Sequence, residues 1–312
     1  MSSEPQQIGG PDGAGLAGGL RDSGYARGVA LVMLAGVFWS LGGILIRSIE
    51  QAGEWQILFY RSAFAALLFF SVLVFRHGRR VFRVFHEAGR KAVLGGLCLG
   101  SGFAGFVFAM VHTSIANAVF ILAVAPLATA LLAWLVLREA VTRRTWISAA
   151  AALVGIGIMV AGGIAAGTLF GNLMALIAML GFSGYAVVLR AGRAGDMLPA
   201  ACLAGVFAAI GAAVMAPDLA VGAQDIAVCA AMGIVQIGAG LVVFTRGSKS
   251  VPAAELALLS LTEVVLAPLW VWIGVGEVPT GATLLGGAIV LAAIAGRAVS
   301  GLKRKPPPFG AV

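Results

Sequence analysis

The sequence is poor in charge. Asp, Glu, Lys and Arg make up 11% of its 312 residues and hydrophobic residues 60%, whereas about a quarter of the residues in ordinary soluble domains are charged. No charged residue occurs from Ala92 to Leu137 or from Thr145 to Leu189. This composition excludes a water-soluble globule. Each charge-free run is long enough for two membrane spans, since one span needs about 20 apolar residues.

Residues that bind metals or catalyse reactions are also scarce. The three cysteines stand alone, and the sequence has no CxxC pair, HExxH motif or phosphate-binding loop. We therefore predict no cofactor, no metal site and no enzymatic activity. One alternative is an intramembrane serine protease, because GFSG at 181–184 matches the GxSG string and would make Ser183 a nucleophile. That alternative needs a histidine base in a later span, and the three histidines all lie upstream, at positions 77, 86 and 112.

Breaks at glycine, proline and charged clusters divide the chain into ten predicted transmembrane helices. They lie near residues 29–47, 56–75, 92–112, 116–137, 145–164, 168–189, 199–216, 226–245, 254–275 and 281–299. The polar, glycine-rich segment 1–24 and the segment 301–312, with its basic and proline residues, are predicted to be disordered tails. The predicted fold class is thus an all-α membrane protein.

The net charge of +8 is explained by a membrane and not by nucleic acid. With ten spans, all of the 21 basic residues except Arg47 and Arg61 fall on one face. The positive-inside rule makes that face, and with it both termini, cytoplasmic. We predict a multi-pass protein of a bacterial-type inner membrane. Its partners would be the lipid bilayer and a small-molecule substrate.

Two stretches of the sequence occur twice. AWLVLREAVT at 133–142 resembles VWIGVGEVPT at 271–280, with Trp, Glu and Thr matching at a separation of 138 residues. AGVFWSLGGILIRS from Ala35 aligns with AMLGFSGYAVVLRA from Ala178, at a separation of 143. Spans 1–5 therefore correspond to spans 6–10, and an odd number of spans turns the second copy over in the membrane. We predict a first half at 25–165 and a second half at 166–300, arranged as inverted repeats that suit alternating access.

Spans 4 and 9 share a further pattern. SIANAVFILAVAPLATALLAWLVLREAVT and AAELALLSLTEVVLAPLWVWIGVGEVPT each have a proline in mid-helix and an acidic residue at the helix end. With its ten spans in two halves, the chain resembles the EamA domains of the drug/metabolite transporter superfamily. LTEVVLAPLWVW is similar to the branch of amino acid exporters, including aromatic ones. The resemblance implies a secondary transporter that exports small amphiphilic metabolites, with amino acids favoured. A drug or another metabolite on the same fold, or a channel, is the alternative.

Polar and aromatic residues inside the spans are the candidate substrate contacts. An ionisable side chain in hydrocarbon costs about 2.5–3.5 kcal/mol, so Glu263, near the predicted midplane, could bind a substrate ammonium or carry a coupled proton. Arg61 could attract a substrate carboxylate from the outer side, or pair with Glu54 or Glu263. For every candidate, helix packing or capping is the alternative. The predicted contact residues are Trp39, Ser40, Tyr60, Arg61, Asn117, Tyr185, Gln236, Ser260, Glu263 and Trp270.

Two prolines are predicted to bend spans 4 and 9, since a proline within a helix removes a backbone hydrogen bond. Pro126 aligns with Val264, and Pro268 follows four residues later. The two kinks are therefore expected one helical turn apart in depth. Such bends could serve gating, although any helix bundle can tolerate them.

Overall fold

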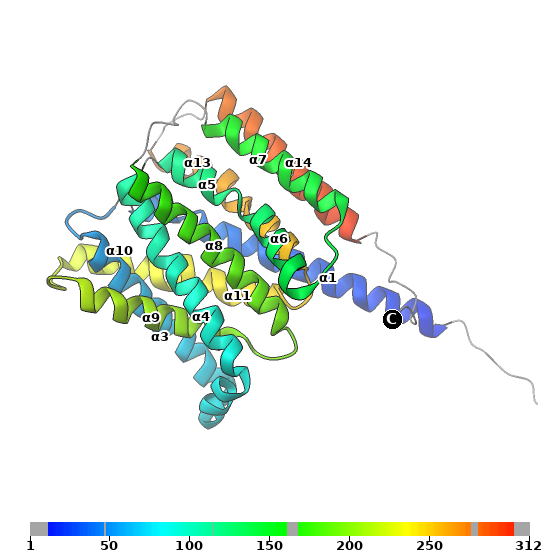
Figure 1. Cartoon of the computed structure of the whole chain (residues 1–312), viewed down its shortest axis with the longest axis horizontal. Helices are drawn as coiled ribbons and strands as arrows, with labels where there is room; N and C mark the ends of the chain where they lie inside the picture. Colours follow the sequence, from blue (N-terminus) through cyan, green and yellow to red (C-terminus); the bar gives the residue numbers. More distant parts are fainter. Residues whose placement is uncertain (1–11, 47, 114, 161–167, 276–279, 303–312) are drawn as a thin grey trace, which may run out of the picture.

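The computed structural model describes residues 12–46, 48–113, 115–160, 168–275 and 280–302. Within these ranges the chain forms helices and no strands (Figure 1). The helices are α1 Asp12–Trp39, α2 Gly42–Ile46, α3 Glu54–His77, η1 Gly78–Arg80, α4 Val81–His112, α5 Ile115–Leu122, α6 Ala125–Leu137, α7 Arg143–Val160, α8 Leu169–Ala191, α9 Leu198–Met215, α10 Ala223–Ala231, η2 Met232–Ala239, α11 Gly240–Gly247, α12 Ala253–Ser260, α13 Thr262–Val275 and α14 Gly281–Leu302.

Within the described ranges, six helical segments are long and apolar enough to cross a membrane. They are Gly24–Ile46, Glu54–His112, Phe120–Leu137, Leu169–Ala191, Leu198–Met215 and Ala223–Gly247. The segment Glu54–His112 is bent at Gly78 and Gly89, whose φ angles of 53° and 49°, with ψ near −130°, only glycine adopts readily. The first helix begins at Asp12, so it includes part of the segment 1–24 that the sequence analysis assigned to a disordered tail. No proline follows Pro11 in this segment to stop it.

The helices pack in pairs that join one half of the chain to the other. Helix α4 packs on α8, and α1 packs on α11. Helix α3 packs on α9, and α7 lies along α14 at one edge of the molecule (Figure 1). Glycine permits the closest approach: a Cβ on Gly181 would meet the Cys98 carbonyl oxygen, and one on Gly105 would lie 2.6 Å from the Met174 carbonyl oxygen. The halves are therefore one interlocked bundle.

Three of the predicted spans are broken near their middle. Helix α1 ends at Trp39 and α2 begins at Gly42, while α5 gives way to α6 around Ala123, and α12 to α13 at Leu261. Ala123 and Leu261 are 138 residues apart, the separation of the sequence repeat. The predicted one-turn offset between the kinks is thus not observed.

Hydroxyl groups explain the break at Leu261 better than proline does. Ser260 Oγ donates to the Ala257 carbonyl at 2.8 Å and Thr262 Oγ1 to the Leu259 carbonyl at 2.7 Å. Such bonds compete with backbone pairing and bend helices. Pro268 lies further along, inside α13. Pro126 lies in the first turn of α6, where its missing N–H would have no intrahelical partner in any case.

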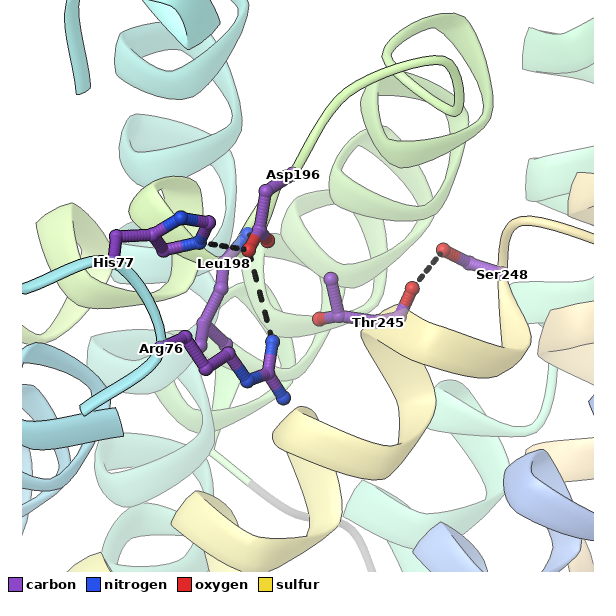
Figure 2. A network of polar contacts seen from close by, with 6 residues as sticks. All are labelled: Arg76, His77, Asp196, Leu198, Thr245 and Ser248. Atoms are coloured by element: carbon purple, nitrogen blue, oxygen red, sulfur yellow. Dashed lines mark hydrogen bonds and ion pairs between the residues drawn. The ribbon is translucent and has the colours of Figure 1, made fainter. Parts of the chain in front are cut away.

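Aspartates tie two of the loops to distant helix ends. Asp225, in the first turn of α10, accepts backbone hydrogen bonds from Glu50, Gln51 and Ala52 at 2.8–3.0 Å. Asp196, before α9, lies 3.2 Å from His77 Nε2 and 3.6 Å from Arg76 at the end of α3 (Figure 2). The first contact fixes the segment before α3 against α10. The second fixes the segment before α9 against the end of α3. Each therefore joins one half of the chain to the other.

Candidate functional site

A cavity of about 240 Å³ lies where the broken helices meet. Its walls come from both halves, and its lining extends from Trp39 and Leu241 to Ile46 and Met110, near the ends of α2 and α4. The lining is largely apolar with a few polar groups, as is usual for sites that bind small molecules. Six of the predicted contact residues line it: Trp39, Ser40, Arg61, Gln236, Ser260 and Glu263.

Glu263 lies at a helix N-terminus inside the protein. Helix α13 begins at Thr262, directly after the break at Leu261, and Glu263 is the second residue of its first turn. The unpaired N–H groups and the helix dipole at such a terminus stabilise negative charge. Within the described ranges, no side chain forms an ion pair or hydrogen bond with the Glu263 carboxylate. It therefore faces the cavity as an uncompensated acidic group.

Arg61 is the largest fully buried side chain among the residues that the structure describes, with 1% of its surface exposed. Its Nη2 donates to the Phe103 carbonyl at 3.1 Å, and its guanidinium carbon lies 5.5 Å from the ring centroids of both Phe103 and Phe106. Its Nε has no hydrogen-bond partner in the described part of the chain. The pairing with Glu54 or Glu263 considered from the sequence is not observed. Glu54 instead lies 3.6 Å from His112.

Gln236 supplies the third polar group of the cavity. It lies in the π-helix η2, and its Nε2 donates to the Trp39 carbonyl at 3.3 Å. That carbonyl needs a partner because α1 ends at Trp39. Gly42 makes room for the amide, since a Cβ there would lie 2.7 Å from Gln236 Nε2. The buried Oε1 of Gln236 accepts no hydrogen bond from any described residue.

An aromatic cluster lies beside the cavity. The ring of Trp39 lies 5.7 Å from that of Phe182, edge to face, and 5.1 Å from that of Phe244. Phe182 and Phe244 are 5.6 Å apart, and Gly240 allows the indole of Trp39 to approach η2 and α11 closely. The cluster therefore joins α1, α8 and α11 at the wall of the cavity.

Three predicted contact residues lie outside the cavity lining. Tyr60 donates its hydroxyl to the Leu219 carbonyl at 2.8 Å, in the segment after α9. Tyr185 is fully buried, and its hydroxyl lies 3.2 Å from Thr245 Oγ1. Trp270 donates from Nε1 to Ser40 Oγ at 2.7 Å. It therefore contacts Ser40, which lines the cavity, without lining the cavity itself. The side chains of Asn117 and Pro268 lie outside what the structure describes.

Replacing Tyr185 with phenylalanine should therefore lower stability and leave substrate affinity unchanged. The variant loses one buried hydrogen bond, worth about 1 kcal/mol. The measurement is thermal unfolding of the purified protein in detergent together with the half-saturating substrate concentration in a transport assay. A weaker affinity at unchanged stability would instead put Tyr185 in the substrate path.

Helix α4 forms a wall of the site that the sequence did not indicate. Phe103, Phe106 and Met110 line the cavity from α4, and Met179 and Phe182 line it from α8. Their spacing follows a helix face, but around these positions both helices are apolar on nearly every side. Nothing in the sequence distinguishes a cavity-facing stripe from one that faces lipid or a neighbouring helix.

Comparison with known proteins identifies the family. The model of the EamA-like transporter family matches residues 26–161 and 169–297. The chain belongs to the EamA-like transporter family. No curated protein matches the EamA chain, whereas 28 chains of solved structures do. One of these crystal structures has a TM-score of 0.76 and 19% sequence identity, and the match covers 89% of this chain and 99% of that one. At this identity the likeness establishes the fold.

Membership of the family makes the EamA protein a multi-pass membrane transporter of small molecules. Members of this family are transporters and not enzymes, so the protease alternative is not favoured. The environment of Ser183 agrees with this view. Its buried hydroxyl donates to the Ala125 carbonyl at 3.3 Å, and no hydrogen bond or ion pair joins it to a histidine among the described residues.

Proposed function

We propose that this EamA protein exports amino acids with apolar or aromatic side chains by alternating access. The observation that carries the proposal is the cavity between the halves, in which Arg61, Glu263 and Gln236 face largely apolar walls. An amino acid offers the complementary groups: a carboxylate, an ammonium and an apolar side chain. A drug or another amphiphilic metabolite is the second candidate, and the largely apolar lining favours it.

The proposed architecture is ten spans in two inverted halves, in an inner membrane with both termini cytoplasmic. Three observations support it. The breaks at Ala123 and Leu261 repeat at the separation of the sequence repeat. The contact of α4 with α8 has a counterpart in that of α11 with α1, as a two-fold exchange of the halves requires. With ten spans, all of the 21 basic residues except Arg47 and Arg61 fall on one face.

Under this proposal the broken helices are the moving parts. A substrate held at the breaks contacts residues of both halves, and rocking of one half against the other exposes it to each side in turn. The break at Ala123 in the first half and the break at Leu261 in the second give each half a bend in the corresponding place. Two similar arrangements, open to opposite sides, can then have nearly equal energies.

Exchange of amino acids in proteoliposomes tests this proposal. Vesicles preloaded with a panel of amino acids should take up a labelled one saturably, and Glu263→Gln should lower that uptake at least about tenfold, because it removes the acidic group from the cavity wall. Glu87→Gln is the matched control, since Glu87 is exposed and pairs with Arg83.

Two other outcomes would be informative. Unchanged uptake by Glu263→Gln would make this glutamate a packing residue and leave the transporter proposal standing. Absence of exchange for every amino acid, in correctly inserted protein, would reject amino acids as cargo in favour of drugs or other metabolites.

A further inference from the structure

Two groups of opposite charge line one cavity and do not neutralise each other. Arg61 and Glu263 both contribute to its wall, and neither has an ion-pair partner among the residues described. The partly buried Glu139, by contrast, pairs with Arg190 at 2.7 Å. We infer that the cavity binds both charged groups of a zwitterion: Arg61 binds the carboxylate and Glu263 binds the ammonium. The inference rests on the proposed function and names the groups by which it selects its substrate.

Arg61 is built as an anion receptor. Burial of a cation without an anionic partner is costly, and contacts with two aromatic faces and one carbonyl offset only part of that cost. Those contacts also fix the guanidinium in place between Phe103 and Phe106. Its Nε–H is a buried donor without an acceptor. A carboxylate oxygen would satisfy this donor and supply the missing charge, through a charge-assisted hydrogen bond.

The ammonium pole has two acceptors. The Glu263 carboxylate provides the charge, and the Oε1 of Gln236 is a buried acceptor with no partner in the described part of the chain. Gln236 is oriented by its own bond to the Trp39 carbonyl, so its Oε1 is held and not free to turn away. An ammonium with three N–H donors can use both groups, whereas a ligand that lacks nitrogen leaves them unsatisfied.

The rest of the lining sets the size and character of the substrate side chain. Met110, Met179, Phe182 and Leu241 line the same cavity as Arg61. Methionine side chains adapt their shape to different apolar groups. A hydrophobic pocket discriminates weakly between apolar groups of similar size, but a site with buried polar groups strongly rejects a ligand that leaves them unpaired. Selection should therefore be strict for the two poles and tolerant for the side chain.

Competition assays on the wild-type protein test the inference without any substitution. The probes are L-phenylalanine and L-leucine, their amides, the amines that lack the carboxylate, and the acids that lack the ammonium. The concentration that halves uptake of the labelled amino acid should be at least about tenfold higher for each analogue than for the amino acid itself. Equal competition by amide and amino acid would overturn the assignment of Arg61.

Substitutions then assign each pole to its residue. In Arg61→Gln the amino acid and its amide should compete almost equally well, so that the ratio of their half-inhibitory concentrations approaches one. The weaker competition by the deaminated acid should remain. Glu263→Gln should give the opposite pattern. Arg61→Lys keeps a positive charge without the planar geometry, so it should keep part of the preference for the amino acid over its amide. Arg76→Gln is the matched control, because Arg76 lies at the end of the same helix beside Asp196 and should leave every ratio unchanged.

The outcomes separate this inference from the proposed function. If the wild-type protein exchanges amino acids but an Arg61 variant keeps the full preference for the carboxylate, the inference is wrong and the transporter proposal stands. If the wild-type protein exchanges no amino acid, both are wrong. If Arg61→Gln fails to fold, Arg61→Lys and the wild-type competition series still decide the question.

Discussion

Replacing Gly43 with tryptophan should abolish transport while leaving the protein folded. Gly43 lines the cavity, and a Cβ at this position has no atom within 4 Å. An indole group there would extend into the cavity of about 240 Å³ and occupy the space of the substrate without displacing a packed side chain. We expect the transport rate to fall by about 100-fold or more, because the indole leaves no room for a substrate in the cavity.

The control for this prediction is Gly43→Ala, which adds a single methyl group to open space. It should transport at nearly the wild-type rate. Size-exclusion profiles and thermal unfolding in detergent should be alike for both variants and the wild type. Normal transport by a folded Gly43→Trp protein would mean that substrate crosses elsewhere.

Reversing the charge of Glu139 should reduce transport by about ten- to 100-fold. Arg190, in the last turn of α8, donates from Nε to Glu139 Oε1 at 2.7 Å, and the two side chains are only 13% and 31% exposed. A second contact, from the Tyr25 hydroxyl to Glu255 at 2.7 Å, joins the first half to the second at the same end of the bundle. Glu139→Arg would place two cations side by side where an ion pair now holds the halves together. Two adjacent like charges that are partly shielded from water repel each other and should weaken this contact.

A charge swap tests whether the pair itself matters. The double variant Glu139→Arg with Arg190→Glu should recover most of the lost transport, since a true pair shows a strong coupling in a double-mutant cycle. Glu87→Arg is the matched control. The Arg83–Glu87 pair has a similar distance of 2.8 Å, but its side chains are 75% and 60% exposed, so its loss should change little. A double variant no better than the worse single variant would rule out the ion pair as a contact between the halves.

Much of the fold was accessible from the sequence because membrane insertion depends on composition. Long charge-free runs predicted apolar helices, and the structure has six helical segments long enough to cross a membrane. The resemblance to EamA domains is confirmed by the family comparison, which matches the chain in two segments. The breaks at Ala123 and Leu261 were expected near Pro126 and Pro268. The break at Leu261 could not be placed exactly because the hydrogen bonds of Ser260 and Thr262 depend on local geometry and not on residue type alone.

The site was accessible in part for a similar reason. Polar residues in apolar spans are costly and therefore conspicuous, so Arg61, Gln236 and Glu263 were found from the sequence, and all three line the cavity. Phe103 and Phe106 were missed because an aromatic residue in an apolar helix is unremarkable by composition. Tyr185 was included for its type, but its hydroxyl turns to Thr245. Which way a side chain faces follows from helix packing, and the sequence pattern does not contain that information.

Access to the cavity from the two sides of the membrane is the most direct test of the account. Ser260 lines the cavity, and a thiol can replace its hydroxyl with little change in size. Ser260→Cys would be made in a protein whose cysteines at 98, 202 and 229 are replaced by alanine, and labelled with a membrane-impermeant thiol reagent from each side in turn. We expect labelling from both sides, slowed in both cases by a transported amino acid. Labelling from one side alone, under every condition, would contradict alternating access through this cavity.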